Sequence, residues 1–246
     1  MTGRHEQEAA FFAAVVNNRV EEARQLAVRH PELLSLQEPD TAVAGRRDKT
    51  ALHKTAMTQN HEMACMLIEL GAPLEATDQF GLTPLMMATQ YRNFPLVKKL
   101  IDAGADPFHN TRDNMTPLMF AAGAGDIDSA KLFVQLGLDV NARRDCGMVA
   151  LHFARRAKDR LDFVTYLVGA GADATLMNNA LETPAILAAR MDDPTYAGDL
   201  ATAQKRKEIR DAAKVLTDQQ DRDVLEHGLP APVAVRRQPL RLNVRA

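Results

Sequence analysis

Short apolar segments alternate with polar turns along most of this chain, and they recur in a fixed order. In each cycle a segment of small and apolar residues comes first, and a second segment carrying a pair of large apolar residues follows. These pairs are Leu67-Ile68, Leu100-Ile101, Phe133-Val134 and Leu167-Val168. Apolar residues grouped in this way within segments of about ten residues are typical of amphipathic helices. The pattern therefore predicts a series of short helix pairs.

Two sequence elements repeat with one shared period. The first element starts at Thr50, Thr83, Thr116, Val149 and Thr183, with spacings of 33, 33, 33 and 34 residues. The second element is a glycine at positions 71, 104, 137 and 171, with spacings of 33, 33 and 34 residues. One residue inserted between the two elements of the fourth unit explains both longer spacings. Repeats of this length form units that stack on their neighbours and share one continuous core.

The first element has the composition of a helix start. In Thr83-Pro84 and Thr116-Pro117 the threonine can cap free backbone N–H groups, and proline is tolerated in the first turn. The small residues that follow allow neighbouring helices to approach closely. The recurring glycines are expected at helix ends, where the backbone adopts a positive φ.

These motifs resemble the ankyrin repeat family, whose period is 33 residues and whose signature is Thr-Pro-Leu-His-x-Ala. Five units match and a degenerate unit precedes them, so the resemblance covers about residues 8 to 217. It implies an all-α ankyrin-repeat solenoid of helix-turn-helix units with hairpin tips, with about six stacked units including caps. It also implies that His53 and His152, in the histidine position of the signature, hydrogen-bond the turn that links neighbouring units.

The boundaries follow from the phase of the repeats. Two short helices separated at Asn17-Asn18 are expected in the N-terminal unit, and the last unit carries an apparent insertion at 192–199 before a helix with Ile209, Ala212, Ala213 and Leu216. We expect a degenerate capping repeat and long connection at 1–44, repeats at 45–77, 78–110, 111–143 and 144–177, a C-terminal capping repeat at 178–217, and an irregular basic tail at 218–246.

Charge and composition narrow the class of protein. The net charge of the 246-residue chain is −2, which argues against nucleic-acid binding by bulk charge. The longest apolar run, Ala9 to Val16, is far shorter than the roughly 20 residues of a membrane-spanning helix. The two cysteines cannot form a disulfide framework, which favours a reducing compartment. These observations predict a cytoplasmic monomer with no membrane or nucleic-acid partner.

The sequence offers little catalytic chemistry. It has no phosphate-binding loop, no Gly-x-Ser-x-Gly and no His-Glu-x-x-His, and the seven histidines form no ligand cluster. Cys146, at an expected hairpin tip, is interpreted as an unreactive surface thiol, with a redox-sensitive thiol as the alternative. We therefore expect no enzymatic activity, no catalytic or metal-binding residues and no cofactor.

The resemblance to ankyrin repeats also implies a binding surface made of hairpin tips and the exposed sides of the first helices. Such positions project from the stack, and aromatic, Met and Arg side chains are enriched in the centres of interfaces. Phe80, Leu82, Met115 and Met148 are expected to form an apolar line at successive tips. The full candidate set is Arg46, Arg47, Lys49, Phe80, Leu82, Tyr91, Arg112, Met115, Met148 and Arg156.

The predicted function is therefore non-enzymatic binding of a partner protein through the concave face of the stack. Its basic residues favour an acidic partner, whose identity the sequence does not give. Two alternatives stay open: an inhibitor or immunity-type protein directed at one enzyme or toxin, and a secreted effector that acts in a host cell.

Overall fold

The computed structural model describes residues 2–37, 48–157 and 159–227, and the regular elements within these ranges are helices. Contacts divide the chain into two units, one ending at Gln204 and one beginning at Lys205, and each is described by itself. The first unit contains the repeats. The all-α, repeated architecture predicted from the sequence is confirmed for the described residues.

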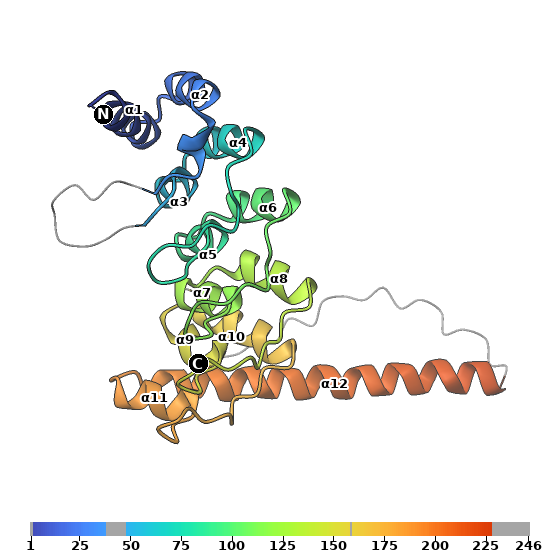
Figure 1. Ribbon diagram of the computed structural model, residues 1–246. Helices are drawn as coiled ribbons and strands as arrows, with labels where there is room; N and C mark the ends of the chain where they lie inside the picture. Colours follow the sequence, from blue (N-terminus) through green and yellow to red (C-terminus); the bar gives the residue numbers. More distant parts are fainter. Residues whose placement is uncertain (1, 38–47, 158, 228–246) are drawn as a thin grey trace. The chain divides into compact units, whose positions relative to one another are not determined.

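In the first unit the helices form two parallel columns (Figure 1). Helices of the inner column pack on one another in the order α1, α3, α5, α7, α9 and α11, and those of the outer column in the order α2, α4, α6 and α8. The inner helices are α1 (Thr2–Val16), α3 (Ala51–Thr58), α5 (Pro84–Gln90), α7 (Pro117–Ala124), α9 (Ala150–Phe153) and α11 (Pro184–Arg190). The outer helices are α2 (Val20–Arg29), α4 (His61–Glu69), α6 (Phe94–Asp102), α8 (Ile127–Gln135) and α10 (Arg160–Gly169).

Three further elements complete the path. The 3₁₀ helix η1 (Pro31–Leu34) follows α2, and η2 (Ala154–Arg156) extends the short α9. The last helix is α12 (Thr195–His227). The expected separation of the first two helices is confirmed, because α1 ends at Val16 and Asn18 has a φ of 55°.

Threonine and proline start the inner helices as predicted. The Thr83 hydroxyl accepts a hydrogen bond from the Met86 N–H at 3.4 Å, and the Thr116 hydroxyl accepts one from the Met119 N–H at 3.2 Å. The proline that follows each threonine occupies the first turn. The recurring glycines close the outer helices, with a φ of 84° at Gly71. The helix pairs that start at Thr83 and Thr116 therefore begin and end at residues whose local chemistry favours a helix boundary.

Two histidines join neighbouring units. The His53 Nδ1 accepts a hydrogen bond from the Thr50 N–H at 3.2 Å, and its Nε2–H donates to the Leu82 carbonyl of the next unit at 2.9 Å. His152 repeats the arrangement, with its Nε2–H donating to the Glu182 carbonyl at 3.1 Å. The role predicted for both imidazoles is confirmed. The units of His53 and His152 are thus tied to the main chain of their successors.

The fifth unit differs from the expectation in one respect. The segment predicted to be an insertion contains the start of α12. The buried residues of this helix are Tyr196, Leu200 and Ala203. The Tyr196 hydroxyl donates to the Leu151 carbonyl at 2.6 Å. Ile209, Ala212 and Ala213, expected to pack, are exposed instead, and the side chain of Leu216 lies outside the described residues. The expectation was wrong because the helix begins directly after Pro194, and Gly198 is tolerated within it.

A polar cluster holds the start of α12. The Arg160 guanidinium donates to Asp193 Oδ2 at 2.7 Å and to Asp199 Oδ2 at 2.5 Å. It also lies over the Tyr196 ring, 5.4 Å from its centroid. The two carboxylates neutralise this half-buried cation. Arg160, at the start of α10, therefore stabilises the turn that precedes α12.

The second unit begins within α12 at Lys205, and the helix continues to His227. The prediction of irregular structure from residue 218 is therefore wrong for 218–227. An uninterrupted run of residues with good helix propensity explains the extension. Residues 228–246, which contain the expected basic tail, lie outside the described residues.

Candidate functional site

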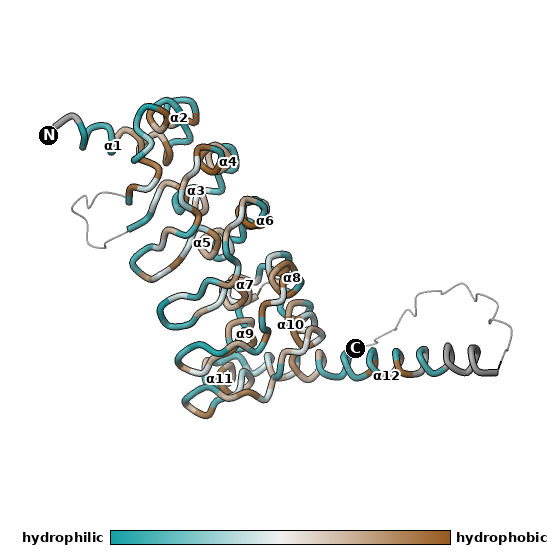
Figure 2. Tube along the Cα trace, turned by 45° about the vertical axis from the view of Figure 1, so that its right-hand side comes forward, coloured by the Kyte–Doolittle hydropathy of each residue, from teal (hydrophilic) through white to brown (hydrophobic). Residues whose placement is uncertain are grey.

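The hairpin tip of the second repeat presents an aromatic side chain on a well-defined turn. The Asp78 carboxylate accepts hydrogen bonds from the Phe80 N–H at 2.9 Å and from the Leu82 N–H at 3.0 Å. Gly81 completes the turn with a φ of 80°. Phe80 remains 62% exposed, and the turn holds it outward. Figure 2 shows the hairpins projecting from the side of the inner column.

The structure separates two hairpin positions that the sequence prediction combined. Leu82 is only 8% exposed, so its place in an exposed apolar line is wrong. It occupies the position before the start of the repeat element, as do Met115 and Met148, whereas Phe80 lies at the tip itself. Met115 is half-buried and packed against the core, and Met148 is half-buried. The turn itself explains the difference, because Gly81, whose φ is 80°, interrupts the extended backbone between Phe80 and Leu82.

The other candidates vary in accessibility. Tyr91 ends α5 and is 40% exposed, and its carbonyl accepts a hydrogen bond from the Gln59 amide at 3.2 Å. Arg112 and Arg156 are exposed, and their side chains have no hydrogen bond or ion pair within the described parts of the chain. Lys49 is half-buried. Arg46 and Arg47 lie outside the described residues.

The tips of the later units are joined to one another. The Arg144 guanidinium pairs with Asp113, with its Nε donating to Oδ2 at 2.8 Å. The Asn114 amide donates to Asp145 Oδ1 at 2.6 Å, and the Asn179 N–H donates to the Cys146 carbonyl at 2.9 Å. Hydrogen bonds from Thr111 and then Arg144 hold the pKa of Asp113 below its ordinary value. These tips therefore form a connected rim.

Two aromatic residues on the inner helices were missed by the sequence prediction. Phe120 and Phe153 are half-buried, and each lies four residues after the start of its repeat element. Gly123 lies beside Phe153, since a Cβ at Gly123 would be 3.9 Å from the Phe153 Cβ. Alignment of the units at their period would have shown this shared position. These residues add apolar area between the tips and the ends of the inner helices.

Leu181 at the last hairpin tip has an unusual backbone. Its φ is 60°, whereas the matching positions hold Gly81, Asn114 and Gly147. A residue other than glycine or asparagine in this region costs about 1–2 kcal/mol. Its side chain is nevertheless 75% exposed. The fold therefore carries local strain at a side chain that contributes nothing to the core.

The buried histidines have structural surroundings. Burial lowers the pKa of both His53 and His152 below the ordinary value, although backbone hydrogen bonds oppose the shift. Among the described residues no three His, Cys, Asp or Glu side chains gather as metal ligands. Within the same residues no helix has the length and apolar character needed to cross a membrane. Cys65 and Cys146 are both free and half-buried.

A family model described as ankyrin repeats (3 copies) matches residues 11–111 and 91–178. The two matches together extend over more than half of the chain, and they include the repeat elements from Thr50 to Gly171. The comparison with curated proteins found no match.

Proposed function

Because the chain belongs to the ankyrin repeat family, whose members generally mediate protein–protein interaction, we propose that it is a non-enzymatic module that binds a partner protein. The proposed surface is the concave face of the inner column, made of its hairpin tips and the ends of its inner helices. The observation that carries this proposal is Phe80, a large apolar side chain held outward by the Asp78 turn. A solvent-exposed aromatic on a turn of defined geometry loses little conformational entropy on binding.

The charges of the same surface support an acidic partner protein. Arg112 and Arg156 expose guanidinium groups that have no partner among the described residues. Arg144, in contrast, is paired with Asp113 and joins two neighbouring hairpin tips. Unpaired guanidinium groups bind carboxylates bidentately without first breaking an internal pair. We therefore propose that acidic side chains of the partner contact Arg112 and Arg156 while an apolar side chain covers Phe80.

The compartment proposed for this interaction is the cytoplasm. The two free cysteines support it, since thiols persist in reducing surroundings. Neither a nucleic acid nor a membrane is proposed as a partner.

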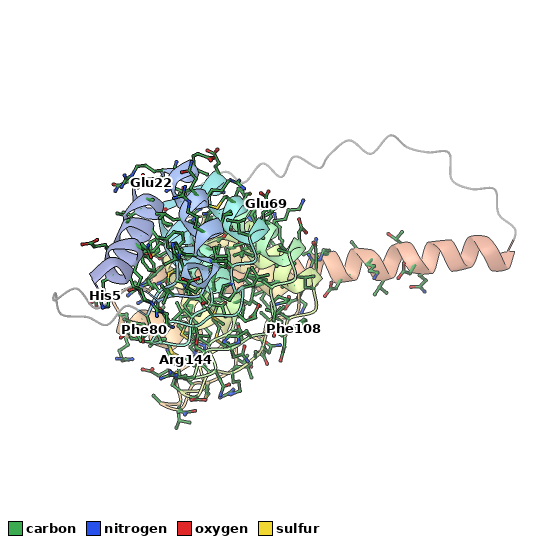
Figure 3. All side chains as sticks on the ribbon, turned by 45° about the horizontal axis from the view of Figure 1, so that its top comes forward. His5, Glu22, Glu69, Phe80, Phe108 and Arg144 are labelled. Carbon is green, nitrogen blue, oxygen red and sulfur yellow. The ribbon has the colours of Figure 1, made fainter. Side chains whose placement is uncertain are left out.

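Affinity capture with quantitative mass spectrometry tests the assignment. The test variant combines Phe80→Ala with Arg112→Ala, and the matched control is Phe108→Ala. Phe108 is similarly exposed, and it lies on the opposite side of the repeats from Phe80 (Figure 3). Truncation of a side chain in the centre of an interface costs about 1–3 kcal/mol, so loss of a captured protein by roughly tenfold or more is expected for the test variant alone.

Equal capture by the wild type and the test variant, with circular dichroism showing a folded chain, would refute the proposed surface. The identity of a protein lost selectively separates the alternatives. An enzyme or toxin whose activity the chain suppresses indicates an inhibitor, and a host protein indicates an effector.

A further inference from the structure

Within the part of the chain that the structure describes, the last repeat leaves exposed the face on which a further repeat would stack. In each preceding unit, the third residue after the start of the repeat element is buried against its successor. His53, Met86, Met119 and His152 are at most 2% exposed. The matching residue of the fifth unit is Ile186, and it is 50% exposed. The two histidines of this series donate hydrogen bonds to the next hairpin. Side chains at this position therefore point toward the following unit.

We call the exposed residues Leu181, Ile186 and Ala189 the end face. Ile186 and Ala189 share one side of α11 because they are three residues apart. The opposite side carries Leu187 and Ala188, which are buried. Figure 2 shows the hydrophobic colouring of α11. A terminal repeat normally presents a polar outer side, and this one does not.

The charges beside the end face are balanced. Arg190 pairs with Glu182, and this ion pair lowers the pKa of the Glu182 carboxyl. An apolar face bordered by one positive and one negative group does not repel its own copy. Under a twofold axis the positive group of one copy can approach the negative group of the other, as required of a surface that meets itself.

We propose that the end face binds a second copy of this chain, with the two last repeats stacked end to end about a twofold axis. The contact continues the helix-on-helix packing that already joins α9 to α11 within the chain. The N-terminal unit of another copy is a poorer occupant, because its α1 exposes Arg4 and His5 and its α2 begins with Glu21 and Glu22. This interface uses none of the residues proposed to bind the partner protein.

Analytical ultracentrifugation of the full chain over a wide concentration range tests the proposal. The wild type is expected to form a species of twice the 27.1 kDa chain mass. Leu181→Asp and Ile186→Asp place a charge in the contact and are expected to raise the dimer dissociation constant by about tenfold or more. Val28→Asp, at an exposed apolar position of α2, is the matched control and should leave the constant unchanged. Both test positions are exposed, so the fold is retained, which circular dichroism verifies.

A second measurement addresses the twofold axis. In a chain with Cys65→Ser and Cys146→Ser, Ile186→Cys is expected to give a dimer with a short bis-maleimide, and Val28→Cys is expected to give none. A wild type that stays monomeric overturns the proposal, although the sequence-based expectation of a monomer would then hold. A dimer insensitive to Ile186→Asp, or one that fails to cross-link through the thiol introduced at 186, places the contact elsewhere and also overturns it.

Discussion

Mild acid is expected to destabilise the repeats through the two buried histidines that join them. His53 and His152 accept a backbone N–H at Nδ1 and donate from Nε2 to a carbonyl. The fold therefore needs both imidazoles neutral. A proton on Nδ1 would point at the backbone N–H whose hydrogen bond Nδ1 accepts, and that hydrogen bond would be lost. Burial accordingly lowers the pKa of both groups below 6.5.

The sign and size of the effect follow from proton linkage. Above pH 6.5 both the folded and the unfolded chain hold neutral imidazoles, and the stability is complete. Below pH 6.5 the unfolded chain binds protons first, so each histidine lowers the free energy of unfolding by up to about 1.4 kcal/mol per pH unit. The loss continues until the pH reaches the lowered pKa of the folded state. Two such groups give a maximum slope of about 2.7 kcal/mol per pH unit.

Urea unfolding followed by circular dichroism at several pH values between 7.5 and 5.0 measures this slope. His152→Gln should lower stability at pH 7.5 and reduce the slope by about half, because one titrating group is removed. His61→Gln, at an exposed position of α4, is the matched control and should leave the slope unchanged. Equal unfolding free energies at pH 7.5 and 5.5, or an undiminished slope in His152→Gln, would refute the reasoning.

Two further predictions concern the backbone and the last helix. Gly104 and Gly147 have φ values of 98° and 79°, but a Cβ at Gly147 would lie 2.5 Å from the Asn179 side-chain oxygen, and one at Gly104 would meet nothing within 4 Å. Alanine should therefore cost about 1 kcal/mol at position 104 and about 3 kcal/mol at position 147, as measured by urea midpoints; equal losses would contradict the contact. Tyr196→Phe removes the hydroxyl that donates to the Leu151 carbonyl and should cost about 1–2 kcal/mol in thermal unfolding, whereas an unchanged midpoint would show that this bond does not hold α12.

The repeated part of the fold could be predicted because its signals are local and recur. Thr83-Pro84 starts a helix by the chemistry of two adjacent residues, and Gly71 ends one by its conformational freedom. The hydrogen bond from His53 to the next unit was implied by the resemblance to the ankyrin repeat family, and its acceptor is a main-chain carbonyl at a fixed spacing. Each of these inferences depends on residues close in the chain or on a fixed spacing.

The last unit could not be predicted in the same way. The start of α12 depends on Arg160, which lies 33 residues before Asp193 and 39 before Asp199. No local pattern shows that a basic residue on α10 will select this turn.

The candidate surface was only partly predictable for a related reason. Phe80 and Leu82 have similar apolar character and lie two residues apart, yet one is exposed and the other is buried. Their difference comes from the Asp78 turn and from the position of the hairpin over the inner helices. The resemblance to ankyrin repeats identified the tips as candidate contacts, and three-dimensional packing decided which side chains are available.

The hydrogen bond from His53 to the main chain of the next unit has a consequence for how the number of repeats can change in evolution. The acceptor is a carbonyl group, so the joint does not depend on the side chain at position 82. A segment of one period, such as 83–115, begins directly after one such carbonyl position and ends at the matching position of the next repeat. Duplication or loss of that segment by unequal recombination would bring an equivalent carbonyl to the same imidazole. A lineage can therefore lengthen or shorten this protein by whole repeats while its surface side chains diverge independently.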